Sequence, residues 1–189
     1  MNWMFNGLPL HPLLVHAVVV LLPLAAILTV LHAVWPAARK RLGWVTPVVA
    51  FVAMVFTVLA KEAGEALEHQ VDETPLLEAH TRLGDGLIPW AIGLFVAAVF
   101  VWVWWAFVAP KLKLSRGSQV ASALVIAIVT VAIAGFSTNA VFQVGESGAK
   151  SVWSDAVSVT SASGGNEAKP QESGAASGSS AQQNDGDGD

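Results

Sequence analysis

Four long apolar stretches constrain the fold of this chain more than any other feature of its sequence. They cover approximately residues 8–38, 42–60, 87–109 and 119–142, and each is near the ~20 residues that cross the hydrocarbon core of a bilayer as a helix. In lipid only helices and closed barrels satisfy every backbone polar group. A barrel would show segments of about ten residues that alternate in and out, and residues 121–136 do not alternate. The sequence therefore predicts an all-α, four-helix transmembrane bundle.

The composition agrees with a membrane protein and removes several kinds of chemistry. Hydrophobic residues make up 54% of the chain and charged residues only 13%, against about 25% charged residues in a typical soluble domain. Cysteine is absent, which excludes disulfides, thiolate metal sites, iron–sulfur clusters and cysteine nucleophiles supplied by this chain. The sequence has no nucleophile elbow, no phosphate-binding loop, no zinc-protease motif and no basic patch large enough for nucleic acid. A non-enzymatic role is therefore favoured, without a nucleic-acid partner.

The distribution of basic residues predicts the orientation of the bundle. Short loops rich in Lys and Arg tend to stay in the cytoplasm. Six of the ten basic residues lie in two short segments without any acidic residue, namely Arg39, Lys40, Arg41, Lys111, Lys113 and Arg116. We therefore predict a multi-pass protein of the cytoplasmic (inner) membrane whose N-terminus and C-terminus are both extracytoplasmic.

The composition changes after the fourth apolar stretch. Beyond about residue 160 the chain consists of Ser, Gly, Ala, Gln and Asp with almost nothing apolar, so burial cannot offset the entropy of ordering it. The sequence predicts a transmembrane domain over residues 1–155 and a disordered, Ser/Gly/Asp-rich extracytoplasmic tail over residues 156–189. Such a tail could be a flexible spacer or a solvated terminus without a specific role.

Histidine side chains near the predicted outer ends of the helices are the main candidates for chemistry. His16 lies about five residues into the first helix, and His80 follows Thr74-Pro75, the pattern of a helix cap with proline at the first position. His80 falls on the face that should turn toward the bundle. Two such histidines on facing helices could bind the iron of haem b from opposite sides. His11 points about 140° away from His16, since five residues advance a helix by ~500°, and is the reserve ligand.

Two other interpretations of these polar residues stay open. A buried neutral histidine bonded to a carbonyl or hydroxyl would explain His16 and His80 without a cofactor. On the second helix Glu62, Glu65 and His69 share a face at i, i+3 and i+7, and they could hold Zn²⁺ or iron if another helix contributed. Their spacing differs from the Glu-x-x-His of diiron bundles, and an exposed acidic stretch is also typical of a solvated helix end.

Four short segments resemble a known bacterial family. They read GLPLHPLLVH at residues 7–16, GEALE at 64–68, EAHTRLG at 78–84 and GESGAK at 145–150. Together they resemble the family named domain of unknown function 2231. The resemblance implies a four-helix membrane module that is sometimes joined to Rieske-type redox domains, which suggests electron transfer by association. Many relatives carry histidine where this chain has Glu146, so a role of that histidine does not transfer.

These observations lead to two functional hypotheses. The first is a haem b-binding electron-transfer module at the outer membrane face, with the lipid bilayer and an extracytoplasmic redox protein as its partners. The second is a non-catalytic membrane anchor or scaffold for an extracytoplasmic redox or envelope complex. The colour of the purified protein distinguishes the two hypotheses, because a haem protein is red with a Soret band and a scaffold without a cofactor is colourless.

Overall fold

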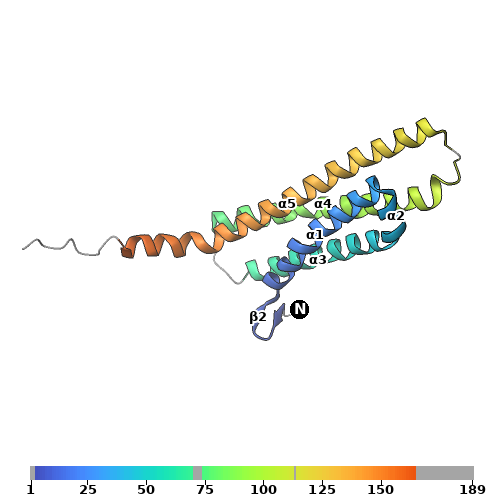
Figure 1. Ribbon diagram of the computed structural model, residues 1–189. Coiled ribbons are helices and arrows are strands. Elements are labelled where there is room, and N and C mark those ends of the chain that lie inside the picture. The colour runs from blue at the N-terminus through green and yellow to red at the C-terminus, as the bar shows by residue number, and fades with distance from the viewer. Residues whose placement is uncertain (1–2, 70–73, 113, 165–189) are drawn as a thin grey trace, which may run out of the picture. The chain divides into compact units, whose positions relative to one another are not determined.

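Helices make up almost all of the structure, a computed structural model that describes residues 3–69, 74–112 and 114–164. A short antiparallel hairpin of β1 (Met4–Phe5) and β2 (Leu8–Pro9) precedes the helices. The helical elements in chain order are α1 (Leu10–Val34), α2 (Pro36–Leu42), α3 (Val45–Glu68), α4 (Pro75–Val103), the π-helix η1 (Trp104–Val108) and α5 (Arg116–Gly164). The long helices α1, α3, α4 and α5 lie side by side over much of their length (Figure 1).

The four predicted spans are confirmed by the long helices. Four helices are long and apolar enough to cross a membrane, and they cover Leu10–Val34, Val45–Glu68, Pro75–Val108 and Arg116–Lys150. The all-α, four-helix fold class is therefore correct. The orientation of the termini stays a prediction.

Helix boundaries differ from the predicted stretches in two places. The first stretch is divided, because α1 ends at Val34 and Pro36 begins the separate helix α2, as suits a residue that favours the first turn of a helix. The third stretch begins earlier than predicted, since α4 starts at Pro75 and continues without interruption through Gly84 and Gly86. The predicted cap is present, with Thr74 Oγ1 accepting a hydrogen bond from the Leu77 amide at 3.2 Å.

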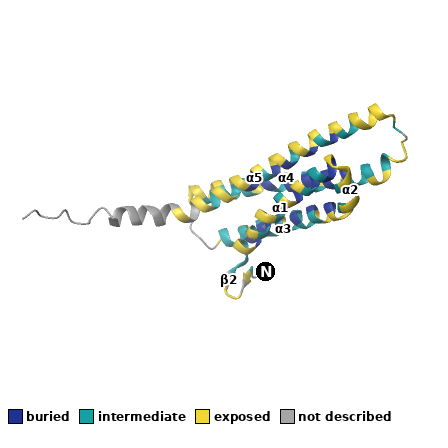
Figure 2. Ribbon diagram, viewed as in Figure 1, coloured by how far each residue is buried: buried dark blue, intermediate teal, exposed yellow. Residues whose placement is uncertain are grey.

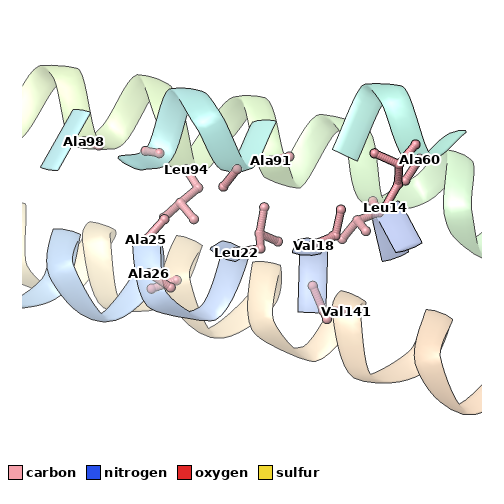
Figure 3. Close-up of a cluster of buried hydrophobic side chains, with 14 of the residues drawn as sticks. Leu14, Val18, Leu22, Ala25, Ala26, Ala60, Ala91, Leu94, Ala98 and Val141 are labelled. Atoms are coloured by element: carbon pink, nitrogen blue, oxygen red, sulfur yellow. The ribbon is translucent and has the colours of Figure 1, made fainter. Parts of the chain in front are cut away.

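Small side chains let the helices approach one another closely in the centre of the bundle. Ala25, Ala53 and Ala98 are completely buried and come from α1, α3 and α4 respectively. Leu22 of α1 and Leu94 of α4 are 1% exposed and fill the space between these backbones, as Figure 3 shows. Small residues are typical of helix interfaces in membranes, where packing replaces the hydrophobic effect between helices.

The outward surface of the helices is strongly apolar. In Figure 2 the ribbon coloured as exposed lies mainly along the outer sides of the long helices, and the ribbon coloured as buried lies mainly where the helices are next to one another. Val20, Leu124 and Phe142 are 63%, 59% and 71% exposed. A soluble monomer rarely exposes such extended apolar surface, so these faces are suited to contact with lipid tails.

The predicted domain boundary at residue 155 falls within α5. This helix continues to Gly164, and the chain divides into compact units at Met1–Ser154 and Asp155–Asp189. The predicted tail begins at residue 156, so its first residues are helical here. Residues 165–189 of the tail lie outside the described residues.

The orientation can be tested with reporters placed at the two ends of the bundle. A reporter that is active only in the cytoplasm should work when inserted beside Arg39 or Arg116 and should fail when fused after Trp153, because the Lys/Arg-rich loops are expected to stay inside. The opposite pattern of activity would show that the bundle is inverted.

Candidate functional site

One end of the bundle, which we call the histidine end, brings His11 of α1 against α3. The Nδ1 atom of His11 lies 2.8 Å from the carbonyl oxygen of Ala60. The ring also lies over Gly64, where an added Cβ would be 3.0 Å from both Cε1 and Nδ1 of His11. The absence of a side chain at Gly64 therefore makes the space that the half-buried imidazole occupies.

His80 has a matching environment between α4 and α5. Its Nδ1 atom lies 2.9 Å from the hydroxyl oxygen of Ser147, and that hydroxyl donates to the carbonyl of Val144 at 2.9 Å. A Cβ added to Gly148 would lie 3.0 Å from Cε1 of His80. Each of the two imidazoles thus lies within hydrogen-bond distance of an oxygen on a neighbouring helix and packs on a glycine of that helix.

The two imidazoles lie next to each other. Their ring centroids are 6.3 Å apart and their planes are nearly perpendicular, at 82°. A carbonyl only accepts hydrogen bonds, so Nδ1 of His11 carries the proton in its bond to Ala60. Because the Ser147 hydroxyl donates to Val144, it accepts from Nδ1 of His80. An imidazole that donates from Nδ1 and is otherwise deprotonated has its lone pair on Nε2, the form in which histidine binds a metal.

Charged side chains surround this end, mostly as ion pairs. Lys61 pairs with Glu65 and lies 3.6 Å from Asp85 of α4. Glu146 pairs with Lys150 at 2.8 Å on α5. These pairs are largely exposed to solvent, so they contribute little to stability, but they place a hydrated polar surface around the two histidines.

His16 does not share the position of His11. It is exposed, and its Nδ1 atom lies 2.6 Å from the carbonyl oxygen of Pro12 on its own helix. His11, and not His16, lies beside His80. The side chains of His11 and His16 leave α1 in different directions, as the helical geometry requires. His80 faces the bundle as predicted.

The acidic alternative is not assembled into a metal site. Glu62 and His69 are exposed, and Glu65 is engaged with Lys61. No group of three or more potential ligands from His, Cys, Asp and Glu occurs among the residues that the structure describes. Glu62, Glu65 and His69 are therefore not gathered with further ligands among the described residues, and metal binding by this set stays a prediction.

The remaining histidine, His32, belongs to the opposite end of the bundle. It is 2% exposed, and its Nδ1 atom lies 3.0 Å from Thr46 Oγ1. Arg39 of α2 donates from Nε to the His32 carbonyl at 2.9 Å and from Nη2 to the Ala33 carbonyl. The Arg39 guanidinium also stacks 3.6 Å from the ring centre of Trp105. Burial lowers the pKa of Arg39 from its ordinary value, and guanidinium stays protonated in proteins.

Comparison with known proteins gives one match. The family described as "Predicted membrane protein (DUF2231)" matches residues 7–161. The chain belongs to the DUF2231 family. No curated protein matches the chain, and no solved structure matches it.

The structure explains why the four segments that resemble DUF2231 are spread along the chain. The segment 7–16 supplies His11 and 64–68 supplies the glycine beneath it, while 78–84 supplies His80 and 145–150 supplies its glycine and serine. All four meet at the histidine end of this DUF2231 protein. The two glycines were not predicted as part of the site, although Gly64 opens the segment 64–68 and Gly148 lies inside the segment 145–150.

Proposed function

We propose that this DUF2231 protein is an electron-transfer module that binds haem b at the histidine end, with His80 and His11 as axial ligands. The observation that carries the proposal is the pair of neighbouring imidazoles with Nε2 lone pairs. Membrane location is established by the family and by the four apolar helices. Haem binding, electron transfer and an extracytoplasmic redox partner are the proposed part.

The separation of the rings supports a shared metal ion. With metal–nitrogen bonds of ~2.0–2.1 Å and about 1.2 Å from ring centre to nitrogen, two imidazoles on opposite sides of one ion lie about 6.4 Å apart. The observed distance between the ring centroids of His11 and His80 is 6.3 Å. The Nδ1 hydrogen bonds to Ala60 and Ser147 are the kind of second contact that fixes the orientation of a ligating histidine.

The number of ligands favours haem over a bare ion. A structural zinc ion takes four protein ligands, but this end of the chain offers two imidazoles and no third clustered ligand among the described residues. A porphyrin supplies four equatorial nitrogens, so its iron needs only two axial ligands. His11 and His80 would hold such a haem, and the chemistry that it would supply is electron transfer and not substrate binding.

The close packing around His11 and His80 restricts how a haem could reach them. Cavities of about 360 and 280 Å³ lie at this end, lined by residues such as Glu68 and Pro75 in one case and Leu76 and Glu146 in the other. Neither is lined by His11 or His80. A porphyrin must therefore part the start of α4 from α1 in order to enter between the rings.

Absorption spectroscopy tests the proposal directly. Protein produced with ample haem should be red with a Soret band, and His11→Ala and His80→Ala should each lose most of the bound haem, because one axial ligand is removed. His69→Ala is the matched control, since His69 is exposed at the end of α3, and it should keep the spectrum. Melting temperatures of all variants separate loss of ligand from loss of fold.

The variant His16→Ala decides between the two candidate ligands on α1. His16 is exposed, so we expect this variant to retain haem. Loss of haem in His16→Ala with retention in His11→Ala would restore the ligand pair predicted from the sequence. Colourless wild-type protein would refute the haem proposal and leave the membrane scaffold as the remaining hypothesis.

A further inference from the structure

The basic end of the bundle, defined by α2 and by the segment that joins η1 to α5, carries positive charge without any acidic counterpart. No Asp or Glu precedes Glu62, and none occurs between Asp85 and Glu146. All four ion pairs found among the described residues lie at the histidine end or beside it. The cations of the basic end therefore need counter-charges from outside the chain.

Arg39 fixes the direction in which its neighbours point. It is turned toward the bundle by its hydrogen bonds to the last turn of α1 and by its stacking on Trp105. Successive helical residues are about 100° apart, so Lys40 and Arg41 point elsewhere, and both are exposed. Lys40 and Arg41 therefore point away from the bundle, while Arg39 attaches the short helix α2 to it.

Exposed tryptophans place this helix at the membrane surface. Trp35 precedes α2 directly, Trp44 follows it after Gly43, and the two are 57% and 64% exposed. Indole side chains prefer the headgroup level of a bilayer, where one part of the ring is in an apolar environment and its N–H is hydrated. With the indoles at that depth, Lys40 and Arg41 lie among lipid phosphates.

We infer that the basic end is a binding surface for anionic phospholipid headgroups, built on Lys40 and Arg41 and supplemented by Lys111 and Arg116. The latter two residues are exposed at the same end of the bundle, before and at the start of α5. Juxtamembrane basic residues attract anionic lipid by a factor of roughly five for each residue. The inference is independent of the haem proposal, because it uses no residue of the histidine end.

Native mass spectrometry of the full chain tests this surface. Protein reconstituted in vesicles of equal parts phosphatidylglycerol and phosphatidylcholine should retain phosphatidylglycerol preferentially on release. The double variant Lys40→Ala/Arg41→Ala should lower the retained phosphatidylglycerol by at least about tenfold relative to phosphatidylcholine. Lys111→Ala/Arg116→Ala should lower it by a smaller factor.

A double variant at the other end supplies the control. Lys61→Ala/Lys150→Ala removes the same number of positive charges from residues that already have acidic partners, and it should leave the lipid preference unchanged. Helical content measured by circular dichroism confirms that each variant is folded. Equal losses in both double variants, no loss in Lys40→Ala/Arg41→Ala, or wild-type protein without a lipid preference would overturn the inference.

Discussion

Replacement of Gly148 by leucine is expected to destabilise the bundle by about 1–3 kcal/mol, the usual cost of forcing extra carbon atoms into a packed interior. A Cβ at this position already lies 3.0 Å from Cε1 and 3.4 Å from Nδ1 of His80. The outer carbons of leucine need the space that the imidazole occupies, so His80 must move and its hydrogen bond to Ser147 is lost. Gly64→Leu should act in the same way on His11.

Gly145→Leu is the matched control for this prediction. Gly145 lies one turn earlier on α5, and an added Cβ would meet nothing within 4 Å. Leucine there should stabilise the helix by about 0.5–1 kcal/mol, because glycine is a poor helix former. Thermal unfolding in detergent should therefore show shifts of opposite sign for Gly148→Leu and Gly145→Leu. Equal shifts would mean that His80 does not pack on Gly148.

The four spans could be predicted from the sequence because lipid leaves few alternatives. A stretch of about 20 apolar residues must satisfy its own backbone, and the helix is the only local way to do so. The end of α1 was harder to place, since the apolar stretch continues past Val34 and only Pro36 marks the start of α2. The length of an apolar stretch predicts that a transmembrane helix exists, but it predicts less accurately where that helix ends.

The direction of His80 was predictable and the choice between His11 and His16 was not. The first turns of α4 are amphipathic, with Glu78 and Arg82 paired on the exposed face, so His80 had to face inward. By contrast, α1 is apolar on all sides around its two histidines. Its pattern fixes the angle between His11 and His16 but carries no information about which one faces α3 and α4.

The glycines at the site illustrate a contact that sequence patterns do not specify. Gly64 and Gly148 lie inside helices, where glycine costs about 1 kcal/mol relative to alanine. Such a cost indicates a packing or functional reason, but not which residue fills the space. Only the arrangement of the four helices identifies His11 and His80 as the occupants.

Replacement of Arg39 by alanine is expected to have the largest effect at the basic end, about 2–4 kcal/mol of lost stability. A charged donor to a backbone carbonyl contributes about 1.5–3 kcal/mol, and Arg39 donates to the carbonyls of both His32 and Ala33. Its stacking on Trp105 at 3.6 Å adds ~0.5–2 kcal/mol. Arg39 is only partly buried and contributions within one network are not additive, so the expected loss is smaller than the sum of these terms. These contacts tie α2 to the end of α1 and to η1, so their loss should release α2 from the bundle.

Two substitutions make the Arg39 prediction specific. Lys40→Ala removes the same charge from the neighbouring exposed residue and should change the free energy of unfolding by no more than about 0.5 kcal/mol. Arg39→Lys keeps the charge but cannot reproduce the planar guanidinium that reaches two carbonyls and stacks on an indole, so it should recover only part of the loss. Thermal or denaturant unfolding in detergent measures all three variants. If Arg39→Lys is as stable as the wild type, charge alone stabilises this end. If Arg39→Ala has the same free energy of unfolding as Lys40→Ala, α2 is held by its apolar contacts and not by Arg39.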